Sequence, residues 1–242
     1  MTDNIEQFPI WRVTETGQSI DTDVVAREFP LTITLNNKEV ATLPCSPQKL
    51  NYLAVGFLAS EGLINSRDDI TKITVDRKKG AVRVKTKKAI KPTPHTQAKK
   101  VDSDITISAP RVFALVEDFI QRSQLFKDTG GVHSAALADT ENILVFGDDI
   151  GRHNAIDKVL GECILNNIPT AGRLLITSGR VSSEIVLKVA RRNIPLLISK
   201  AAPTNLGVRL AQKLGLTLIG FARNKKMNLY ANEWRVKGQE LK

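Results

Sequence analysis

The second half of the chain alternates short apolar segments with amphipathic ones, and this alternation most constrains the fold. The pattern predicts strands at 173–177, 195–199 and 216–221, with helices between them at 182–192 and 204–214. Strands that alternate with helices at this spacing are typical of right-handed parallel crossovers. We therefore expect a layered α/β domain in this part of the chain.

The segment upstream of this region is expected to supply one more helix and a hairpin. Apolar periodicity predicts a helix from about Ala109 to Lys127, followed by paired strands at 133–138 and 143–146. The chain then enters Asp149 to Lys158, where apolar spacing resumes and continues to Ile164. This segment is interpreted as a loop that leads into a helix N-terminus, with an acid favoured by the helix dipole and a relaxed glycine backbone.

The first third of the chain is expected to form a smaller α+β unit. Two predicted hairpins, within 29–43 and 70–86, flank one helix, which Ser46 is expected to cap and Gly62 to end. The stretch 87–103 is basic, polar and contains two prolines, so it is interpreted as an interdomain linker. We expect an α+β protein overall, with an N-terminal α+β domain at 1–95 and a C-terminal α/β domain at 96–242.

The charge balance implies an acidic partner. The net charge is +10 and the pI is about 9.7, which suit nucleic acid, an anionic protein surface or a phosphate-rich small molecule. Aromatic residues are only 5% of the chain, and the basic runs contain no interleaved aromatics, which argues against single-stranded nucleic acid. These runs are interpreted as solvated hairpin edges.

Other compositional features argue against a membrane or secreted protein. No apolar run approaches the roughly 18 residues that span a bilayer, and the N-terminus lacks signal-peptide features, so a cytoplasmic location is expected. Cys45 and Cys163 are the two cysteines, and no CxxC motif occurs, so neither a disulfide framework nor a zinc site is predicted. The spacing of Cys163 indicates a core position.

A binding site is expected where the parallel strands end, because ligands bind there in α/β sheets. The residues that follow the three strands, Ser178-Gly-Arg180, Lys200-Ala-Ala202 and the segment 223–226, each include a cation. Helix N-termini at the same edge add backbone donors, so a phosphate-bearing ligand is favoured. From the residues alone, the expected site comprises His133, Asp149, Gly151, Arg152, His153, Asn154, Lys158, Ser178 and Arg180.

Simpler interpretations of these residues stay open. Asp149 could be only a helix cap, Arg180 an ordinary surface charge, and each histidine a structural residue. Two kinds of catalysis are argued against: Ser178 lacks the G-x-S-x-G of a nucleophile elbow, and His133 is not followed by the glutamate and cysteines of a zinc deaminase. His133 and His153 could still act as acids, bases or phosphate ligands.

Three motifs together resemble the formate dehydrogenase accessory protein family, FdhD/NarQ. They are Ser46-Pro through Ala54-Val-Gly-Phe-Leu-Ala-Ser-Glu-Gly62, Thr129-Gly-Gly-Val-His133, and Asp149 to Lys158, in that order. The resemblance implies a cytidine-deaminase-like three-layer α/β/α domain without zinc. It also implies a cytoplasmic sulfurtransferase that takes sulfur from a cysteine desulfurase, passes it to the bis-molybdopterin guanine dinucleotide cofactor, and serves the formate dehydrogenase catalytic subunit.

The resemblance further implies a homodimer and a dinucleotide-binding stretch near the C-terminus, with GDP as a partial mimic of the cofactor. Mapped onto this chain, the stretch comprises Ile219, Gly220, Phe221, Ala222, Arg223, Asn224, Lys225 and Lys226. The chain departs from the family pattern here, because Asn224 and Lys225 replace the expected Pro-Gly.

A second departure affects the chemistry. The family carries sulfur on a Cys-Gly-x-Cys-Gly loop, whereas the corresponding segment here, 93–104, has no cysteine, and Cys45 is a weak substitute. No catalytic residue is therefore assigned, and whether the chain is an enzyme stays open. Two hypotheses follow: a protein that binds the cofactor and supports its sulfuration and delivery, or a non-enzymatic chaperone for a molybdenum or tungsten cofactor. Nucleic-acid binding is a third, disfavoured one.

Overall fold

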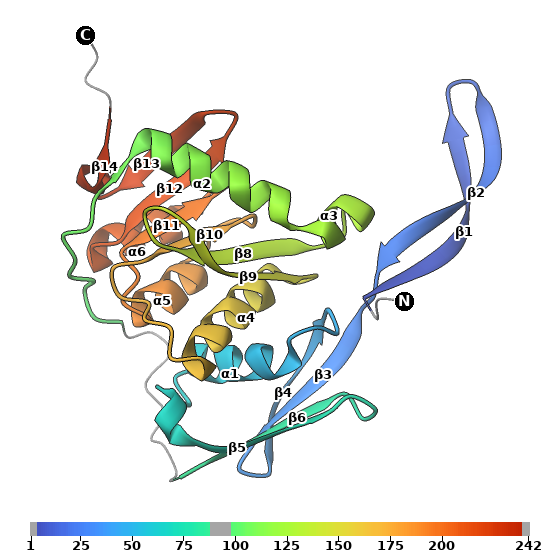
Figure 1. Ribbon diagram of the computed structural model, residues 1–242, viewed down its shortest axis with the longest axis horizontal. Coiled ribbons are helices and arrows are strands. Elements are labelled where there is room, and N and C mark those ends of the chain that lie inside the picture. The colour runs from blue at the N-terminus through green and yellow to red at the C-terminus, as the bar shows by residue number, and fades with distance from the viewer. Residues whose placement is uncertain (1–3, 88–97, 239–242) are drawn as a thin grey trace.

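A six-stranded mixed sheet forms the centre of the protein. The computed structural model of the 242-residue chain describes residues 4–87 and 98–238 (Figure 1). The sheet has the order β13-β12-β11-β10-β8-β9, in which β10, β11 and β12 are parallel and the other three strands run antiparallel to their neighbours. The strands are β8 (His133–Ala138), β9 (Ile143–Asp149), β10 (Leu174–Thr177), β11 (Leu196–Ser199), β12 (Thr217–Arg223) and β13 (Lys226–Ala231). The predicted parallel strands are confirmed, whereas β13 was not predicted.

Helices cover both faces of this sheet, which gives the predicted three layers. Alternate residues of β10 point to opposite faces: Ile176 packs with the core beneath α2 (Ala109–Arg122), and Leu175 packs with the core beneath the other helices. Those helices are α4 (Arg152–Leu165), α5 (Ser183–Arg191) and α6 (Asn205–Leu214), as Figure 1 shows. Strands β10 and β11 are buried along their whole length, as expected for a sheet covered on both sides. The α/β class is confirmed, and the likeness to cytidine deaminases stays a prediction.

A second, four-stranded sheet lies beyond α4. Its order is β4-β3-β6-β5, and α1 packs on its inner face. The elements are β3 (Phe29–Leu35), β4 (Lys38–Cys45), α1 (Leu50–Ser60), the 3-10 turn η1 (Arg67–Asp69), β5 (Ile70–Asp76) and β6 (Ala81–Thr86). Both predicted hairpins are confirmed, and Asn36 and Asn37 turn the first with φ values of 50° and 67°.

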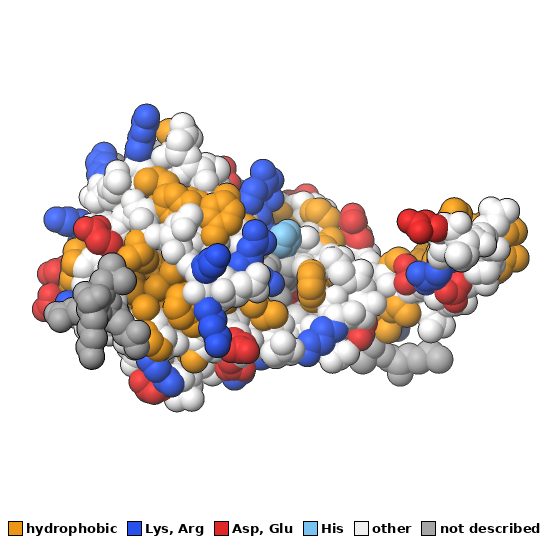
Figure 2. All heavy atoms as spheres, turned by 90° about the horizontal axis from the view of Figure 1, so that it is seen from above, with side chains coloured by type: hydrophobic (Ala, Val, Ile, Leu, Met, Phe, Trp, Pro, Cys, Tyr) orange, Lys and Arg blue, Asp and Glu red, His pale blue; other side chains and the backbone are white. Residues whose placement is uncertain are grey.

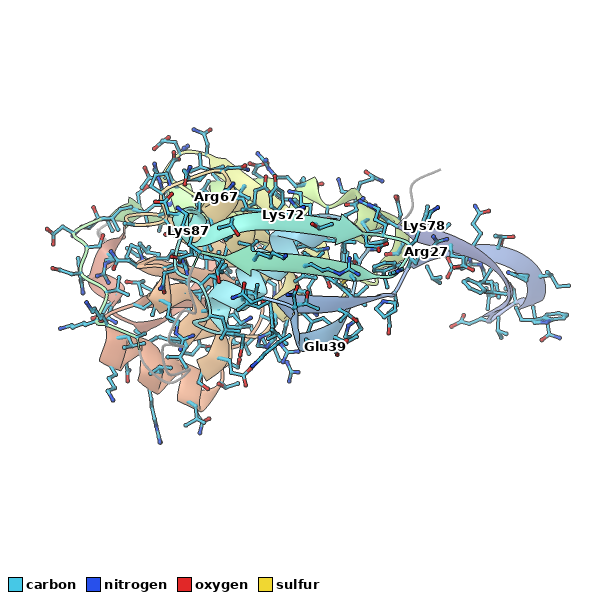
Figure 3. The ribbon with its side chains drawn as sticks, turned by 90° about the horizontal axis from the view of Figure 1, so that it is seen from below. Arg27, Glu39, Arg67, Lys72, Lys78 and Lys87 are labelled. Carbon is cyan, nitrogen blue, oxygen red and sulfur yellow. The ribbon has the colours of Figure 1, made fainter. Side chains whose placement is uncertain are left out.

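The outer face of this small sheet is basic and exposed. Lys72 and Lys85 are directly opposed on β5 and β6, and Arg83 follows on the same side. Figure 3 views this face from below, with Arg67 and Lys87 toward one end and Lys78 toward the other. The prediction that the basic runs form solvated hairpin edges is confirmed for Arg77, Lys78 and Lys79 at the turn between β5 and β6 and for Lys85 on β6. It is wrong for Lys99 and Lys100, which are exposed but lie outside any strand.

Helices α1 and α4 join the two sheets through a contact between their backbones. A Cβ atom added at Gly56 would overlap the carbonyl oxygen of Asp157, and one added at Gly161 would overlap that of Tyr52. Glycine at both positions lets the helices approach more closely than side chains would allow. The N-terminal core also includes Ile164 of α4, so the two units share packing. The predicted boundary between 95 and 96 lies outside the described residues and stays a prediction.

An extended hairpin at the N-terminus was not predicted. Strands β1 (Ile5–Thr14) and β2 (Gly17–Ala26) pair along their whole length and project from the body (Figure 1). We call residues 5–26 the arm. At the other end of the described chain, β7 (Ile107–Ser108) pairs with β14 (Val236–Lys237), next to the 3-10 turn η2 (Glu233–Arg235).

Two predicted helix boundaries are wrong. The helix expected from Ala109 to Lys127 breaks at Ser123, whose hydroxyl accepts the amide of Phe126 and starts a separate helix, α3 (Gln124–Thr129). Helix α1 begins at Leu50 rather than beside Ser46, because Lys49 takes a left-handed conformation with φ 54°. Gly62, with φ 71°, follows the end of α1 as predicted.

The described end of the predicted linker packs on the protein. Residues 98–103 are described, and Val101 is buried while its amide donates to the carbonyl of Leu214. This part of the segment therefore packs on the C-terminal unit. The remainder, 88–97, lies outside the described residues.

Candidate functional site

The loops that follow the three parallel strands meet at one edge, as the sequence predicts. Thr177 and Ser199 are in register, and the Lys200 amide donates to the carbonyl of Thr177. The Phe221 amide donates to the carbonyl of Ala201, which ties the third loop to the second. Strand β8 runs antiparallel and begins at this same edge, so it brings His133 there. Four chain segments therefore converge on the edge.

His133 is held in place by the first of these loops. Its Nδ1 lies 3.2 Å from the Ser178 hydroxyl, which also accepts the Ser134 amide at 3.0 Å. Burial lowers the pKa of His133, and the charges of Arg152 and Arg180 lower it further. The imidazole is therefore neutral at pH 7 and lies in a positive field. An anion bound beside it would favour the protonated ring.

Arg152 extends from the start of α4 across the loop after β10. It packs directly on Gly179, where an added Cβ would lie 2.8 Å from the Arg152 Cβ. The Arg152 Nε is buried and has no hydrogen-bond partner among the described residues. Buried polar groups normally have a partner, so this donor leaves the site incompletely satisfied. Gly151 is the N-cap of α4 and also leaves room for the side chain of Asn154.

A pocket of about 370 Å³ opens at this edge. Lys200 lies above the Phe126 ring, with its ammonium 5.9 Å from the ring centroid. Burial lowers the pKa of Lys200, and the charge of Arg223 contributes. Figure 2 shows a histidine among Lys and Arg side chains on this face of the molecule. The pocket is lined by Phe126, Gly130, Gly131, Val132, His133, Ile150, Ser178 and Lys200.

This pocket combines a cation, an aromatic ring, a histidine and two glycines. A cation and backbone amides suit phosphate, and a ring suits the face of a base. Phe126 and Ile150 were missed by the sequence analysis. The Gly130-Gly131 pair was the available signal, because it ends α3 and thereby places Phe126 over the pocket.

The predicted dinucleotide-binding stretch has some side chains buried in the core and others exposed at the surface. The side chains of Ile219 and Ala222 are fully buried in the core, so they do not face the edge. Phe221 is 36% exposed. Its backbone has φ 52°, a left-handed conformation that is rare for a residue with a bulky side chain. Residues Arg223, Asn224 and Lys225 line a separate pocket of about 290 Å³ against α2, and Lys226 begins β13. A Cβ at Gly220 would lie 2.9 Å from the Tyr230 ring.

Asp149 and Lys158 occupy a different place from the one expected. Both side chains are fully buried, and Lys158 Nζ lies 2.7 Å from Asp149 Oδ2. Lys158 also donates to the carbonyls of Ser46 and Asp148, while Asp149 accepts the amides of Ser46 and Gly151. These contacts satisfy all three Nζ donors of Lys158. The pair therefore fixes the loop before α1 to the start of α4 and does not face a ligand.

His153 and Asn154 also lie away from the edge. They line a cavity of about 440 Å³ between α1, α4 and α5. His153 Nε2 is 3.8 Å from Glu184, and burial lowers the pKa of this histidine, followed by the charges of Lys188 and Arg152. Asn154 donates to the carbonyl of Pro44 and to Asp149. His153 and Lys158 therefore lie apart from the edge at which they were expected to join Arg152, because a helical segment presents its residues to different sides.

Neither cysteine is available for sulfur chemistry in this structure. Cys45 is fully buried, its thiol donates to the carbonyl of Phe29, and burial raises its pKa to about 12. Cys163 is 2% exposed in the core, as predicted, and burial raises its pKa to about 12 as well. A persulfide carrier requires an accessible thiolate near neutral pH. Cys45 therefore does not have the environment of a substitute carrier.

Two further observations concern metal binding and membrane spanning. Within residues 4–87 and 98–238, no three His, Cys, Asp or Glu side chains come together as a metal site. No helix in the same ranges has the length and apolar character needed to span a membrane. Both statements concern the described part of the chain.

Fold and site together define an α/β protein with a cation-bearing pocket at the ends of its parallel strands. Comparison with known proteins narrows this class. The model of the FdhD/NarQ family matches residues 26–101 and 87–237. The chain therefore belongs to the FdhD/NarQ family.

Individual relatives match over nearly the full chain. Sulfur carrier protein FdhD of Bacillus subtilis (strain 168) is 40% identical, over 94% of this chain and 96% of the relative. Sulfur carrier protein FdhD of Staphylococcus haemolyticus (strain JCSC1435) is 39% identical, over 93% and 95%. A crystal structure of a putative formate dehydrogenase accessory protein from Desulfotalea psychrophila matches with a TM-score of 0.88 at 28% identity, over 97% of this chain and 100% of that one.

Proposed function

We propose that this protein is a formate dehydrogenase accessory protein that binds the guanine dinucleotide ends of bis-molybdopterin guanine dinucleotide at the strand-end edge. The pocket beneath Lys200 and Phe126 carries the proposal, because it places a cation, an aromatic ring and His133 around one cavity. Each half of the cofactor presents a pyrophosphate and a guanine, which need those two kinds of contact. Arg152, with its unpartnered Nε, and Arg180 add positive charge beside the pocket.

The second pocket of the edge extends this assignment. Arg223 ends β12, and Asn224 and Lys225 form the turn to β13. All three belong to the exposed part of the predicted dinucleotide-binding stretch. The side chains of Ile219 and Ala222 serve as its buried support. We assign Lys226, at the start of β13, to the same cationic rim.

The two cysteines favour the chaperone hypothesis over sulfur transfer by this chain alone. Both thiols are buried and have pKa values of about 12, so neither forms a thiolate at neutral pH. The protein then supports sulfuration by holding and delivering the cofactor, while a thiol on another protein carries the sulfur. The proposed partners are a cysteine desulfurase and the formate dehydrogenase catalytic subunit, in the cytoplasm. The homodimer that the resemblance implies stays a prediction.

Calorimetric titration with GDP and with ADP tests the binding site. We expect GDP to bind preferentially, and Arg180→Ala and Lys226→Ala to weaken it. Lys213→Ala is the matched control, because Lys213 is an exposed lysine in the last turn of α6, at the opposite end of that helix from the edge. Equal binding of both nucleotides, or no binding of either, contradicts the proposal.

A persulfide assay separates the chaperone from the sulfurtransferase. The protein is incubated with a cysteine desulfurase and cysteine, and its intact mass is followed. We expect no sulfur adduct. An adduct that disappears in Cys45→Ala would show that Cys45 becomes accessible and carries sulfur, and it would overturn the chaperone assignment.

A further inference from the structure

The outer face of the small sheet concentrates the positive charge of the protein. Residues 70–87, which form β5, β6 and the turn between them, contain seven cationic side chains and one acidic side chain, Asp76. Their net charge is therefore +6, which is more than half of the +10 of the whole chain. Figure 3 views this face, with Lys72 along it and Lys87 toward one end. We call Lys72, Arg83, Lys85 and Lys87 the cationic stripe.

The stripe is arranged at a cost to the free protein. Lys72 on β5 and Lys85 on β6 are directly opposed, and both are exposed. Like charges opposite each other on neighbouring strands are destabilising. Within residues 4–87 and 98–238, neither lysine side chain has an acidic partner, and Arg83 has only a loose ion pair at 3.8 Å from Asp76. An anionic surface over this face would relieve the repulsion.

Protection of the sheet edge does not explain the stripe. Lysine on an exposed edge strand prevents pairing with other chains, and β5 is an edge of this sheet, so protection accounts for Lys72. Arg83 and Lys85 lie on β6, which is paired with β3 on one side and β5 on the other. Cations on an interior strand protect no edge. Their position across the face therefore indicates binding.

The composition and shape of the face select among anionic partners. Strands β5 and β6 contain no aromatic residue on which a base could stack, and their exposed outward side chains include no large apolar residue that could enter a membrane. A four-stranded sheet is too broad for the major groove of DNA, which admits a helix or a two-stranded ribbon. Thr74 and Thr34 flank Arg83 across the sheet and offer hydroxyl groups to a polypeptide. These features favour an acidic protein segment.

We propose that the cationic stripe docks an acidic segment of a partner protein, which lies along β5 and β6 with its carboxylates over the stripe. The seven residues of β5, at about 3.3 Å each, give a length of roughly 23 Å for this contact. A contact of that extent is smaller than a stable protein interface, so the docking is transient and sensitive to salt.

The position of the stripe leaves the strand-end pocket open. The small sheet lies on the far side of α1 from α4, and its outer face points away from the six-stranded sheet (Figure 1). An acidic segment on the stripe and a ligand in the pocket can therefore be bound at the same time. The assignment of this surface does not depend on which ligand the pocket binds.

Fluorescence anisotropy of the full-length protein with a labelled peptide of about eight glutamates tests the docking face. We expect binding that added NaCl weakens and that the double variant Lys72→Glu, Lys85→Glu weakens at least about tenfold. The double variant Arg209→Glu, Lys213→Glu is the matched control, because it reverses two exposed cations of α6 and changes the net charge by the same amount. Equal losses in the two double variants, or no binding to the parent protein, would overturn the proposal.

Duplex DNA and vesicles that contain phosphatidylserine are titrated in the same way. We expect both to bind more weakly than the peptide. Tighter binding of either one, lost in the Lys72→Glu, Lys85→Glu variant, would assign the stripe to nucleic acid or to a membrane surface and overturn the proposal.

Lys85→Glu alone separates docking from a structural role of the stripe. It sets opposite charges across the strand pair, so the thermal unfolding midpoint should rise by about 1–3 °C while the affinity for the peptide falls. A midpoint that falls together with the affinity would show that the lysine acts through the fold, and it would contradict docking on this face.

Discussion

Replacement of Lys158 by methionine tests whether the Asp149 and Lys158 pair is structural, as its burial indicates. Methionine keeps the length of the side chain but removes the charge. Lys158 Nζ is 2.7 Å from Asp149 Oδ2, 3.0 Å from the Asp148 carbonyl and 3.2 Å from the Ser46 carbonyl. The substitution leaves the carboxylate of Asp149 buried without its cation. Loss of one partner from such a pair costs about 3–5 kcal/mol of unfolding free energy.

The cost translates into a readily measured change. For a chain of this size, each kcal/mol shifts the thermal midpoint by about 2–4 °C, so we expect a decrease of roughly 6–20 °C by circular dichroism. Lys49→Met is the matched control. Lys49 also pairs with a carboxylate, Glu162, but its side chain is 36% exposed, and an exposed pair is worth at most about 1 kcal/mol.

A double-mutant cycle isolates the interaction. In an Asp149→Asn background the buried negative charge is absent, so Lys158→Met should cost less than in the parent protein. If Lys158→Met alone changes the unfolding free energy by less than about 1 kcal/mol, or if its cost is the same in both backgrounds, the buried pair does not hold the two units together.

Three more outcomes follow from the described contacts. Gly161→Ala should destabilise the protein by about 3 kcal/mol or more in urea unfolding, because the new methyl group meets the backbone of α1; a change below about 1 kcal/mol would contradict that close contact. Cys45 should resist alkylation at pH 8 until the protein unfolds, since its pKa is about 12; rapid labelling of the folded protein would refute its burial. The folded-state pKa of His133 is below its usual 6.5, so its contribution to stability is present above pH 6.5 and is lost as the pH falls through the folded-state pKa. Arg180→Ala should raise that pKa in an NMR titration, and an unchanged value would exclude the charge effect.

The alternation of strands and helices after residue 173 was predictable from the spacing of apolar residues. The strands β10 and β11 are continuous apolar runs, and the helices α5 and α6 have apolar residues on one face at helical spacing. The same reasoning placed Ser178 and Lys200 at one edge, since parallel strands end together. The arm was not predicted. Most of its side chains stay exposed, so burial never imposed a clean alternation, and Pro9 interrupts the strand pattern.

The role of Asp149 and Lys158 could not be predicted for a different reason. Two charged residues beside a helix start have the same local pattern in a binding site and in a buried pair. The deciding contacts come from Ser46, which lies 103 positions before Asp149 in the chain. In contrast, Gly130 and Gly131 carried a local signal, because a helix must end there and the pocket forms beside that end.

The close packing of α1 on α4 also bears on how the chain folds during synthesis. The N-terminal core is completed by Ile164 and Leu165, which lie at the end of α4. Although domains generally fold in order from the N-terminus as they leave the ribosome, the small sheet and α1 have to wait here until residue 165 has emerged. During that interval the small sheet can cover one side of α1, but the side that packs on α4 at Gly56 stays exposed, and this is the stage at which a chaperone would bind the growing chain.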